Sequence, residues 1–354
     1  MFTNIIGQIK RTHDRYPYIF VGALFLFAVF LLFSLIPSTT LKWREMKDSA
    51  EQLAKGPTSQ LDGLSVTSTG EERPDIIAVM IDNHPDALPQ AGLKDAPVVY
   101  EAPVEGGLTR FMAIYAKNGV AEKVGPVRSA RPYYLDWLRE YGDALYMHCG
   151  GSPAALDLIK QENIFDANEF YNGGYYWRDN LRYAPHNLYT KAGNWQKLWS
   201  DKSVARTIKV WDGWKFDETS PTGTEATDIK ELNIKYSPGY EAGWKYNAVN
   251  KNFERQMDGK PHADTTGQIT ADNILIQFAS VEILDEVGRR AIETVGQGEA
   301  RVLRDGKIIK GIWKKEGIYD RTRFFNASGE EIKLKPGRTW IQVVPLGTVL
   351  EVAK

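Results

Sequence analysis

The chain has 354 residues, a formal net charge of −1, 25% charged residues and 43% hydrophobic residues. This length allows two domains with separate cores, and the composition is that of an ordinary folded protein. The near-neutral charge argues against nucleic-acid binding, which needs a basic face. The single cysteine, Cys149, excludes an internal disulfide and a cysteine-rich zinc site.

An apolar segment near the start predicts one transmembrane helix at residues 18–37, because residues 16–41 carry no charge and about 20 apolar residues cross a bilayer. A cleaved signal peptide is the alternative, but the run is long for one and residues 37–40 offer no small-x-small cleavage site. Basic residues are balanced on its two sides. We expect residues 1–17 to be cytoplasmic and the folded domains extracytoplasmic, in a single-pass cell-membrane protein, because a large domain translocates regardless of nearby charge.

Residues 38–73 begin with a short polar helix pattern and then become rich in Gly, Ser and Thr, which is typical of a linker. From residue 74 to 218 the pattern predicts an α/β domain with a mixed sheet flanked by helices. Residues 75–82 form a continuous apolar run ending in Asp82, and residues 96–102 form a second strand that carries Glu101. Asp82 would lie at the carboxyl end of its strand, where α/β proteins place ligands, but capping the following turn is an equal interpretation. Asp82 and Glu101, with Glu105, would hold a divalent metal such as Mg²⁺ or neutralise nearby arginines.

The most informative stretch is residues 105–137, EGGLTRFMAIYAKNGVAEKVGPVRSARPYYLDW. It contains two strand patterns, at residues 111–116 and from residue 124, which would pair as a hairpin. Arg110 precedes the first pattern, and Arg128 and Arg131 follow the second, so a hairpin would place all three on one rim. Three guanidinium forks on one rim predict a site for carboxylate or phosphate. The alternative is that each arginine pairs with an acid such as Glu101 or Glu105.

A helix is predicted at residues 132–141 and a strand at residues 144–148. The sequence Cys149-Gly150-Gly151-Ser152-Pro153 then opens a helix to residue 161, with Ser152 as N-cap. A Gly-Gly turn at a helix N-terminus can hold an anion, so Gly150, Gly151 and Ser152 are further candidates. Cys149 fits a buried small residue better than a nucleophile, because no Cys-His pair has an informative spacing.

Residues 165–190 are dense in Tyr, Trp, Asn and Gly without periodicity, and long ordered loops of this kind are often functional. The polar candidates in this loop are Arg178, Arg182 and His186. Arginines among aromatic rings suit a sugar or a lipid-linked headgroup, and they equally suit a self-packed loop. A helix at residues 192–205 would close the domain. Residues 228–354 carry short strands separated by turns, and they predict a mostly β second domain.

Several motifs resemble the YerB-like lipoproteins, a two-domain family of unknown function. They include VMIDN (79–83), VGPVRSARPY (124–133), HCGGS (148–152), APHNLY (184–189) and PGRTWI (336–341). The resemblance covers roughly residues 73–346 and leaves the chemistry open. The chain departs from the lipoprotein label, because its N-terminal segment has no cysteine to acylate.

The first domain also resembles the LytR-CpsA-Psr transferases in its order of strand-acid, T-R-F, P-V-R-S-A-R and a Gly-Gly turn. Those membrane-anchored enzymes move polymers from polyprenyl-pyrophosphate carriers, hold the pyrophosphate with arginines, and use an acid with magnesium. The resemblance implies Arg110, Arg128 and Arg131 as the clamp and Asp82 as the acid. This chain has Phe111 and Pro132 where that family has acids after its arginines.

Two functional hypotheses follow. The first is a cell-envelope protein that binds an anionic glycan, a lipid-linked headgroup or a protein partner through the arginine-rich rim, without catalysis. The second is a phosphotransferase acting on polyprenyl-pyrophosphate-linked polymers. The first needs only the arginines and tolerates the missing acids, so the sequence favours it.

Overall fold

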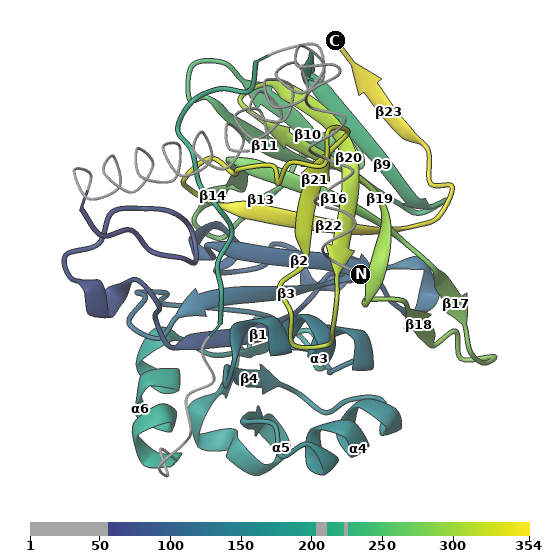
Figure 1. Ribbon diagram of the computed structural model, residues 1–354. Coiled ribbons are helices and arrows are strands. Elements are labelled where there is room, and N and C mark those ends of the chain that lie inside the picture. Colours follow the sequence, from purple (N-terminus) through teal and green to yellow (C-terminus); the bar gives the residue numbers. More distant parts are fainter. Residues whose placement is uncertain (1–55, 203–210, 223–225) are drawn as a thin grey trace, which may run out of the picture. The chain divides into compact units, whose positions relative to one another are not determined.

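A computed structural model describes residues 56–202, 211–222 and 226–354. Residues from Thr58 to Lys354 form one compact unit (Figure 1). The predicted transmembrane helix at residues 18–37 lies outside the described residues. No helix within the described ranges is long and apolar enough to cross a membrane.

An 11-stranded mixed sheet runs through both predicted domains. In spatial order its strands are β21 (Arg323–Asn326), β20 (Lys307–Lys315), β19 (Gly296–Arg304), β16 (Asn273–Ala279), β22 (Thr339–Pro345), β2 (Val98–Pro103), β3 (Thr109–Ala116), β1 (Ile76–Asp82), β4 (Leu145–His148) and β5 (Asp166–Asn168), and β8 (Ala226–Asp228) pairs with β20. The two halves join where β2 pairs in parallel with β22, with Val99 opposite Trp340 and Glu101 opposite Gln342. The predicted mixed sheet and mostly β second half are confirmed, and the two halves share this sheet.

A second sheet belongs to the C-terminal half. It contains β12 (Lys260–Pro261), β11 (Asn252–Met257), β10 (Tyr240–Asn247), β9 (Glu231–Ser237) and β23 (Leu350–Ala353), and β15 (Thr270–Ala271) pairs with β11. Three strand pairs stand apart: β6 (Trp177–Arg178) with β7 (Leu188–Tyr189), β13 (Ala263–Asp264) with β14 (Gly267–Gln268), and β17 (Val281–Ile283) with β18 (Arg290–Ile292).

The helices cluster at the β1–β4 side of the large sheet (Figure 1). They are α3 (Pro132–Leu138), α4 (Pro153–Gln161), α5 (Glu169–Asn172) and α6 (Ala192–Lys202), with the short 3₁₀ turns η1 (Thr69–Glu71), η2 (Pro85–Ala87), η3 (Leu93–Asp95), η4 (Glu105–Gly107), η5 (Arg139–Tyr141) and η6 (Gly173–Tyr175). The helices predicted at 132–141 and 153–161 are found as α3 with η5 and as α4. The end of the helix predicted at 192–205 lies outside the described residues.

Both faces of the large sheet are covered, which explains why β1 reads as a continuous apolar run with every residue buried. Ile77, Val79 and Ile81 face the second sheet and α6. The alternate residues Ala78 and Met80 face α3, α4 and the tryptophans at 211 and 214.

The hairpin predicted between residues 111–116 and 124 is wrong. The first pattern is β3, whose two edges pair with β1 and β2. Residues 124–127 make only isolated bridges, including Ile81 with Val127. Gly125 has φ +146°, and an added Cβ would lie 2.6 Å from the Leu188 carbonyl oxygen, while Pro126 has no N–H to donate. This segment therefore passes the end of β1 and does not form a continuous strand paired with β3.

The linker prediction for residues 38–73 is also wrong from Thr58 onward. Leu61 is buried in the core, and the amide of Gln60 donates to the carbonyl of Glu72 at 2.7 Å. The carbonyl of Asp62 accepts from the amide of Gly337, so this segment is tied to the C-terminal half. Glycine and serine here form a tight turn, which the composition did not distinguish from a linker.

Candidate functional site

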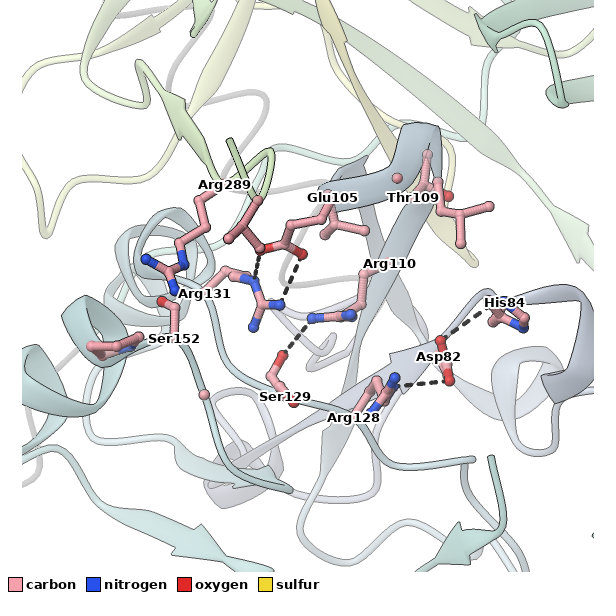
Figure 2. Close-up of a pocket in the computed structure, with 16 residues that line it drawn as sticks. Asp82, His84, Glu105, Thr109, Arg110, Arg128, Ser129, Arg131, Ser152 and Arg289 are labelled. Atoms are coloured by element: carbon pink, nitrogen blue, oxygen red, sulfur yellow. Dashed lines mark hydrogen bonds and ion pairs between the residues drawn. The ribbon is translucent and has the colours of Figure 1, made fainter. Parts of the chain in front are cut away.

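A cavity of about 690 Å³ lies where β1 ends and β3 begins. Arg110, Arg128 and Arg131 all line it, together with Gly151 and Ser152 at the start of α4 (Figure 2). The predicted convergence of the three arginines is therefore found, although by a different route. In the antiparallel register of β1 and β3, Asp82 stands opposite Arg110, which brings the last residue of one strand beside the first residues of the other. The amide of Arg128 then donates to the Met80 carbonyl at 2.9 Å, which holds the third segment against β1.

Arg110 is the most buried arginine of the cavity, with 6% of its surface exposed. Its Nη1 donates to the Ser129 carbonyl at 3.0 Å, and its Nε has no hydrogen-bond partner among the described residues. No described carboxylate lies within ion-pair distance of it. Burial, and after it the positive charge of Arg131, lowers the pKa of Arg110. The site therefore holds a buried cation that the protein only partly compensates.

Arg131 meets Glu105 through both arms of its fork, with Nε–Oε1 at 2.7 Å and Nη2–Oε2 at 2.8 Å. Burial opposes the charge of Glu105, but the bonds from Arg131 outweigh it and lower the pKa of Glu105. The turn that carries Glu105 contains Gly106 and Gly107 at φ +71° and +73°, a region that glycine enters without strain.

Asp82 is engaged by two hydrogen-bond partners and one ion-pair partner. Its Oδ2 lies 3.0 Å from Arg128 Nε and 2.7 Å from His186 Nδ1, and its Oδ1 accepts from the His84 amide at 3.2 Å. Asp82 is thus both the turn cap and the ion-pair partner that the sequence left open. The expectation that each arginine pairs with an acid holds for Arg128 and Arg131 and fails for Arg110.

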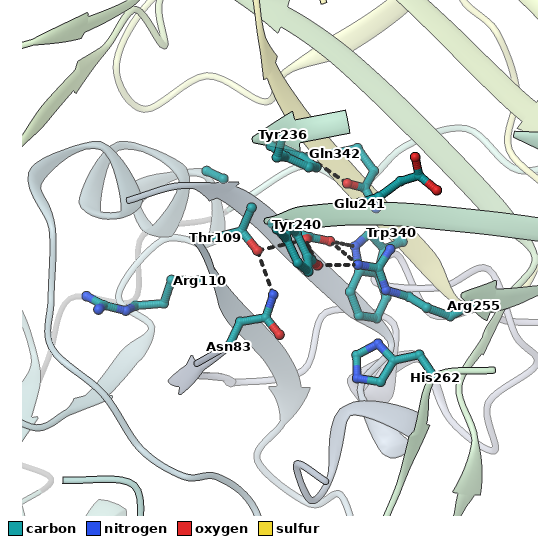
Figure 3. A network of polar contacts seen from close by, with 12 residues as sticks. Asn83, Thr109, Arg110, Tyr236, Tyr240, Glu241, Arg255, His262, Trp340 and Gln342 are labelled. Carbon is teal, nitrogen blue, oxygen red and sulfur yellow. Dashed lines mark hydrogen bonds and ion pairs between the residues drawn. The ribbon is translucent and has the colours of Figure 1, made fainter. Parts of the chain in front are cut away.

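Glu101 lies outside the cavity, so its predicted place beside Asp82 is wrong. It is fully buried and pairs with the fully buried Arg255 of β11 at 2.8 Å (Figure 3). It also accepts from Thr109, Tyr240 and Trp340 at 2.8, 2.5 and 3.1 Å. The Glu101 side chain points from β2 toward the second sheet. The sequence alone does not show which face of β2 that sheet covers.

Of the other site residues predicted from the sequence, some line the cavity and some lie outside it. Gly151 and Ser152 line the cavity, and Ser152 Oγ caps α4 by accepting from the Ala155 amide at 3.3 Å. Gly150 does not line it. Arg178 binds Asn187 at 2.9 Å, and Arg182 binds the carbonyls of Ala87 and Pro89 at 2.6 and 2.8 Å. His186 reaches the cavity indirectly, through Asp82.

Four polar cavity residues were not expected from the sequence: His84, Thr109, Ser129 and Arg289. Thr109 and Ser129 adjoin predicted arginines, but their polarity alone gave no signal. Arg289 comes from the β17–β18 turn of the C-terminal half, far away in the chain. Four arginines and two carboxylates line the cavity, a net formal charge of 4 − 2 = +2 that favours an anionic ligand.

The predicted Mg²⁺ does not fit these residues. Asp82 is engaged by His186, the His84 amide and the ion pair with Arg128. Glu105 is engaged by the Arg131 fork, and Glu101 is buried elsewhere. Mg²⁺ needs an octahedral shell of oxygen ligands, and no set of free carboxylates remains at the cavity among the described residues.

Comparisons with known proteins place the chain in a family. The family described as "Protein of unknown function (DUF3048)" matches through its N-terminal domain at residues 61–205 and through its C-terminal domain at residues 232–341. The chain belongs to this two-domain family, as its resemblance to the YerB-like proteins indicated. "Putative lipoprotein YerB" of Bacillus subtilis (strain 168) is 32% identical over 316 residues, which cover 85% of this chain and 90% of YerB.

The crystal structure of YerB from Bacillus subtilis is similar, with a TM-score of 0.74 at 28% sequence identity. The match covers 84% of this chain and 99% of the YerB chain. The resemblance to the LytR-CpsA-Psr transferases stays a prediction.

Replacing Arg110 tests whether it serves the site and not the fold. We expect Arg110→Met to leave the free energy of unfolding unchanged or to raise it by up to about 4 kcal/mol, because a buried and incompletely compensated charge is removed. The matched control is Arg255→Met, which strands the buried carboxylate of Glu101 and should cost about 3–5 kcal/mol. Urea unfolding of residues 58–354 measures both. An Arg110→Met loss as large as that of Arg255→Met would show that Arg110 is structural.

Proposed function

We propose that the protein binds an anionic ligand, bearing phosphate or carboxylate groups, in the arginine-lined cavity. The observation that carries this proposal is Arg110, a cation with 6% of its surface exposed and no carboxylate within ion-pair distance among the described residues. Keeping a guanidinium desolvated without a counter-charge is costly. An anion in the cavity would supply the missing charge.

The cavity suits a small polar headgroup. Its volume of about 690 Å³ lies within the range of small-molecule sites. Val104, Leu108 and Val287 add apolar lining beside the arginines. This mixture fits a phosphorylated or acidic glycan, or a lipid-linked headgroup, and it gives a ligand with an apolar portion a surface to contact.

Binding is favoured over phosphoryl transfer by the state of Asp82. The LytR-CpsA-Psr resemblance gives Asp82 the role of the acid that assists through magnesium. Its carboxylate oxygens already accept from the His84 amide and face His186 and Arg128, so it is a poor base and a poor magnesium ligand. Arg128 and Arg131 need no such freedom, because a ligand oxygen can share their remaining N–H groups.

Pyrophosphate is the probe for this proposal. We expect binding by the wild-type protein, and a loss of about tenfold or more in affinity for Arg128→Ala. Arg128→Lys should be nearly as damaging, because lysine keeps the charge and loses the planar fork. The matched control is Arg323→Lys, since Arg323 is 28% exposed and paired to one carboxylate, and Arg128 is 26% exposed and likewise paired.

Isothermal titration calorimetry measures the four affinities. Equal affinity of wild type and Arg128→Lys would contradict a clamp based on guanidinium geometry. If the wild type bound neither pyrophosphate nor the dicarboxylate succinate, the anion proposal itself would fail, and a protein partner would become the better occupant.

We also propose that the folded unit is extracytoplasmic and attached to the membrane by residues 18–37. The relative YerB is named a lipoprotein, and a lipid-modified protein is membrane-attached. In this sequence the only cysteine is Cys149, which is partly buried in the folded unit, so the apolar segment is the feature that can provide attachment.

A reporter fusion tests this orientation. Alkaline phosphatase joined after Lys354 should be active, because that enzyme matures only outside the cytoplasm, and β-galactosidase at the same position should be inactive. The reverse pattern would place the folded unit in the cytoplasm.

A further inference from the structure

Two histidines and an aspartate meet at the edge of the cavity. His84 and Asp86 belong to the turn after β1, and His186 belongs to the loop before β7. Their ligand atoms all lie within 4.8 Å of one another. The two imidazole rings stack with centroids 4.5 Å apart and planes at 21°. About 100 residues of chain separate the histidines, so the fold and not local sequence brings them together.

His186 is held in the form that binds metals. Its Nδ1 lies 2.7 Å from Asp82 Oδ2, and a carboxylate only accepts hydrogen bonds, so Nδ1 carries the proton. In the neutral ring Nε2 then carries the free lone pair. A carboxylate behind a histidine in this way fixes the ring and raises its basicity in metal sites. Asp82 is itself fixed by Arg128, so the support of His186 is rigid.

His84 and Asp86 present two more lone-pair donors. A cation at His84 Nδ1 would replace the hydrogen bond that this nitrogen accepts from the Asp86 amide at 3.2 Å, which shows that the nitrogen carries a lone pair. It lies 3.6 Å from Asp86 Oδ2. Two ligands of a tetrahedral ion, each at about 2.1 Å, are about 3.4 Å apart, so this spacing is close to that of a shared cation. Asp86 is mostly exposed, with 74% of its side chain accessible, and can rotate to close the remaining distance to His186.

Arg182 ties the two segments together. Its Nη1 and Nη2 donate to the carbonyls of Ala87 and Pro89, in the same turn as His84 and Asp86. Arg182 lies four residues before His186, so this clamp holds the loop of one histidine to the turn of the other. The backbone segments of the two histidines are therefore held together before any cation arrives.

We propose that His84, Asp86 and His186 form a binding site for a divalent transition-metal ion of the Zn²⁺ type. Two imidazoles and one carboxylate favour zinc over magnesium or calcium, and three protein ligands leave a fourth position open. Asp82 and His84 also line the arginine cavity, so the ion would add positive charge at its edge (Figure 2). The site stands on its own residues and does not depend on anion binding.

Zinc titration of the full-length protein in detergent, without a polyhistidine tag and stripped by chelator, tests the site with no anion present. We expect one Zn²⁺ per chain, and a visible absorption spectrum of tetrahedral type when Co²⁺ replaces it. His84→Gln, His186→Gln and Asp86→Asn should each weaken zinc binding at least tenfold. Asp82→Asn changes no proposed ligand but weakens the support of His186, and it should weaken zinc binding by about 10–100-fold. The control is Asp157→Asn, an exposed carboxylate of α4 that should bind as wild type.

Circular dichroism without metal checks that the variants fold. Asp86→Asn changes an exposed side chain and remains informative if a histidine variant does not fold. Absence of stoichiometric zinc binding would overturn the proposal. Zinc binding that is unchanged in Asp86→Asn and in the folded histidine variants would overturn it too, because the ion would then lie elsewhere. Since pyrophosphate is absent, either result leaves the anion proposal standing.

Discussion

The buried ion pair between Glu101 and Arg255 is the contact on which the rest of the structure depends. Both side chains are fully buried, so each would be very costly without the other. Burial disfavours the charge of Arg255, but Glu101 together with Tyr240 and Tyr236 outweighs it and raises the pKa of Arg255. The Arg255 guanidinium also lies over the rings of Trp244 and Trp340, at 5.1 and 4.7 Å from their centroids. The pair therefore locks the second sheet of the C-terminal half onto the strands of the N-terminal half.

This network reaches the cavity through one hydroxyl group and one side-chain amide group. Glu101 accepts from Thr109 Oγ1, which in turn accepts from Asn83 Nδ2 at 2.7 Å (Figure 3). Thr109 precedes Arg110, and Asn83 follows Asp82. The residues that open β3 and close β1 are thus tied to the buried ion pair. Hydrogen bonds from this buried network hold both positions, which explains how Arg110 stays in place with so few bonds of its own.

Local features of this chain can be predicted from its sequence, but the strand pairs and the contacts between distant segments cannot. The apolar run at residues 75–82 predicts a buried strand because covered strands are uniformly apolar, and Ser152 is predicted as a cap because its neighbours fit a helix start. The hairpin at residues 111–124 was wrong because an apolar run does not reveal which strand pairs with it. The arginines converged nonetheless, since the register of β1 and β3 leads to the same edge. Glu101 and Arg289 were unpredictable because their surroundings come from the other half of the chain.

The cavity combines two kinds of arginine. Arg128 and Arg131 are oriented by carboxylates, while Arg110 is buried without one, and this arrangement leaves a net positive charge facing a space of ligand size. A crystal structure of the protein grown with pyrophosphate tests this account most directly. It predicts electron density for the anion within hydrogen-bond distance of the guanidinium groups of Arg110 and Arg128. Saturated crystals in which the cavity holds only water, or in which the anion lies away from Arg110, would contradict it.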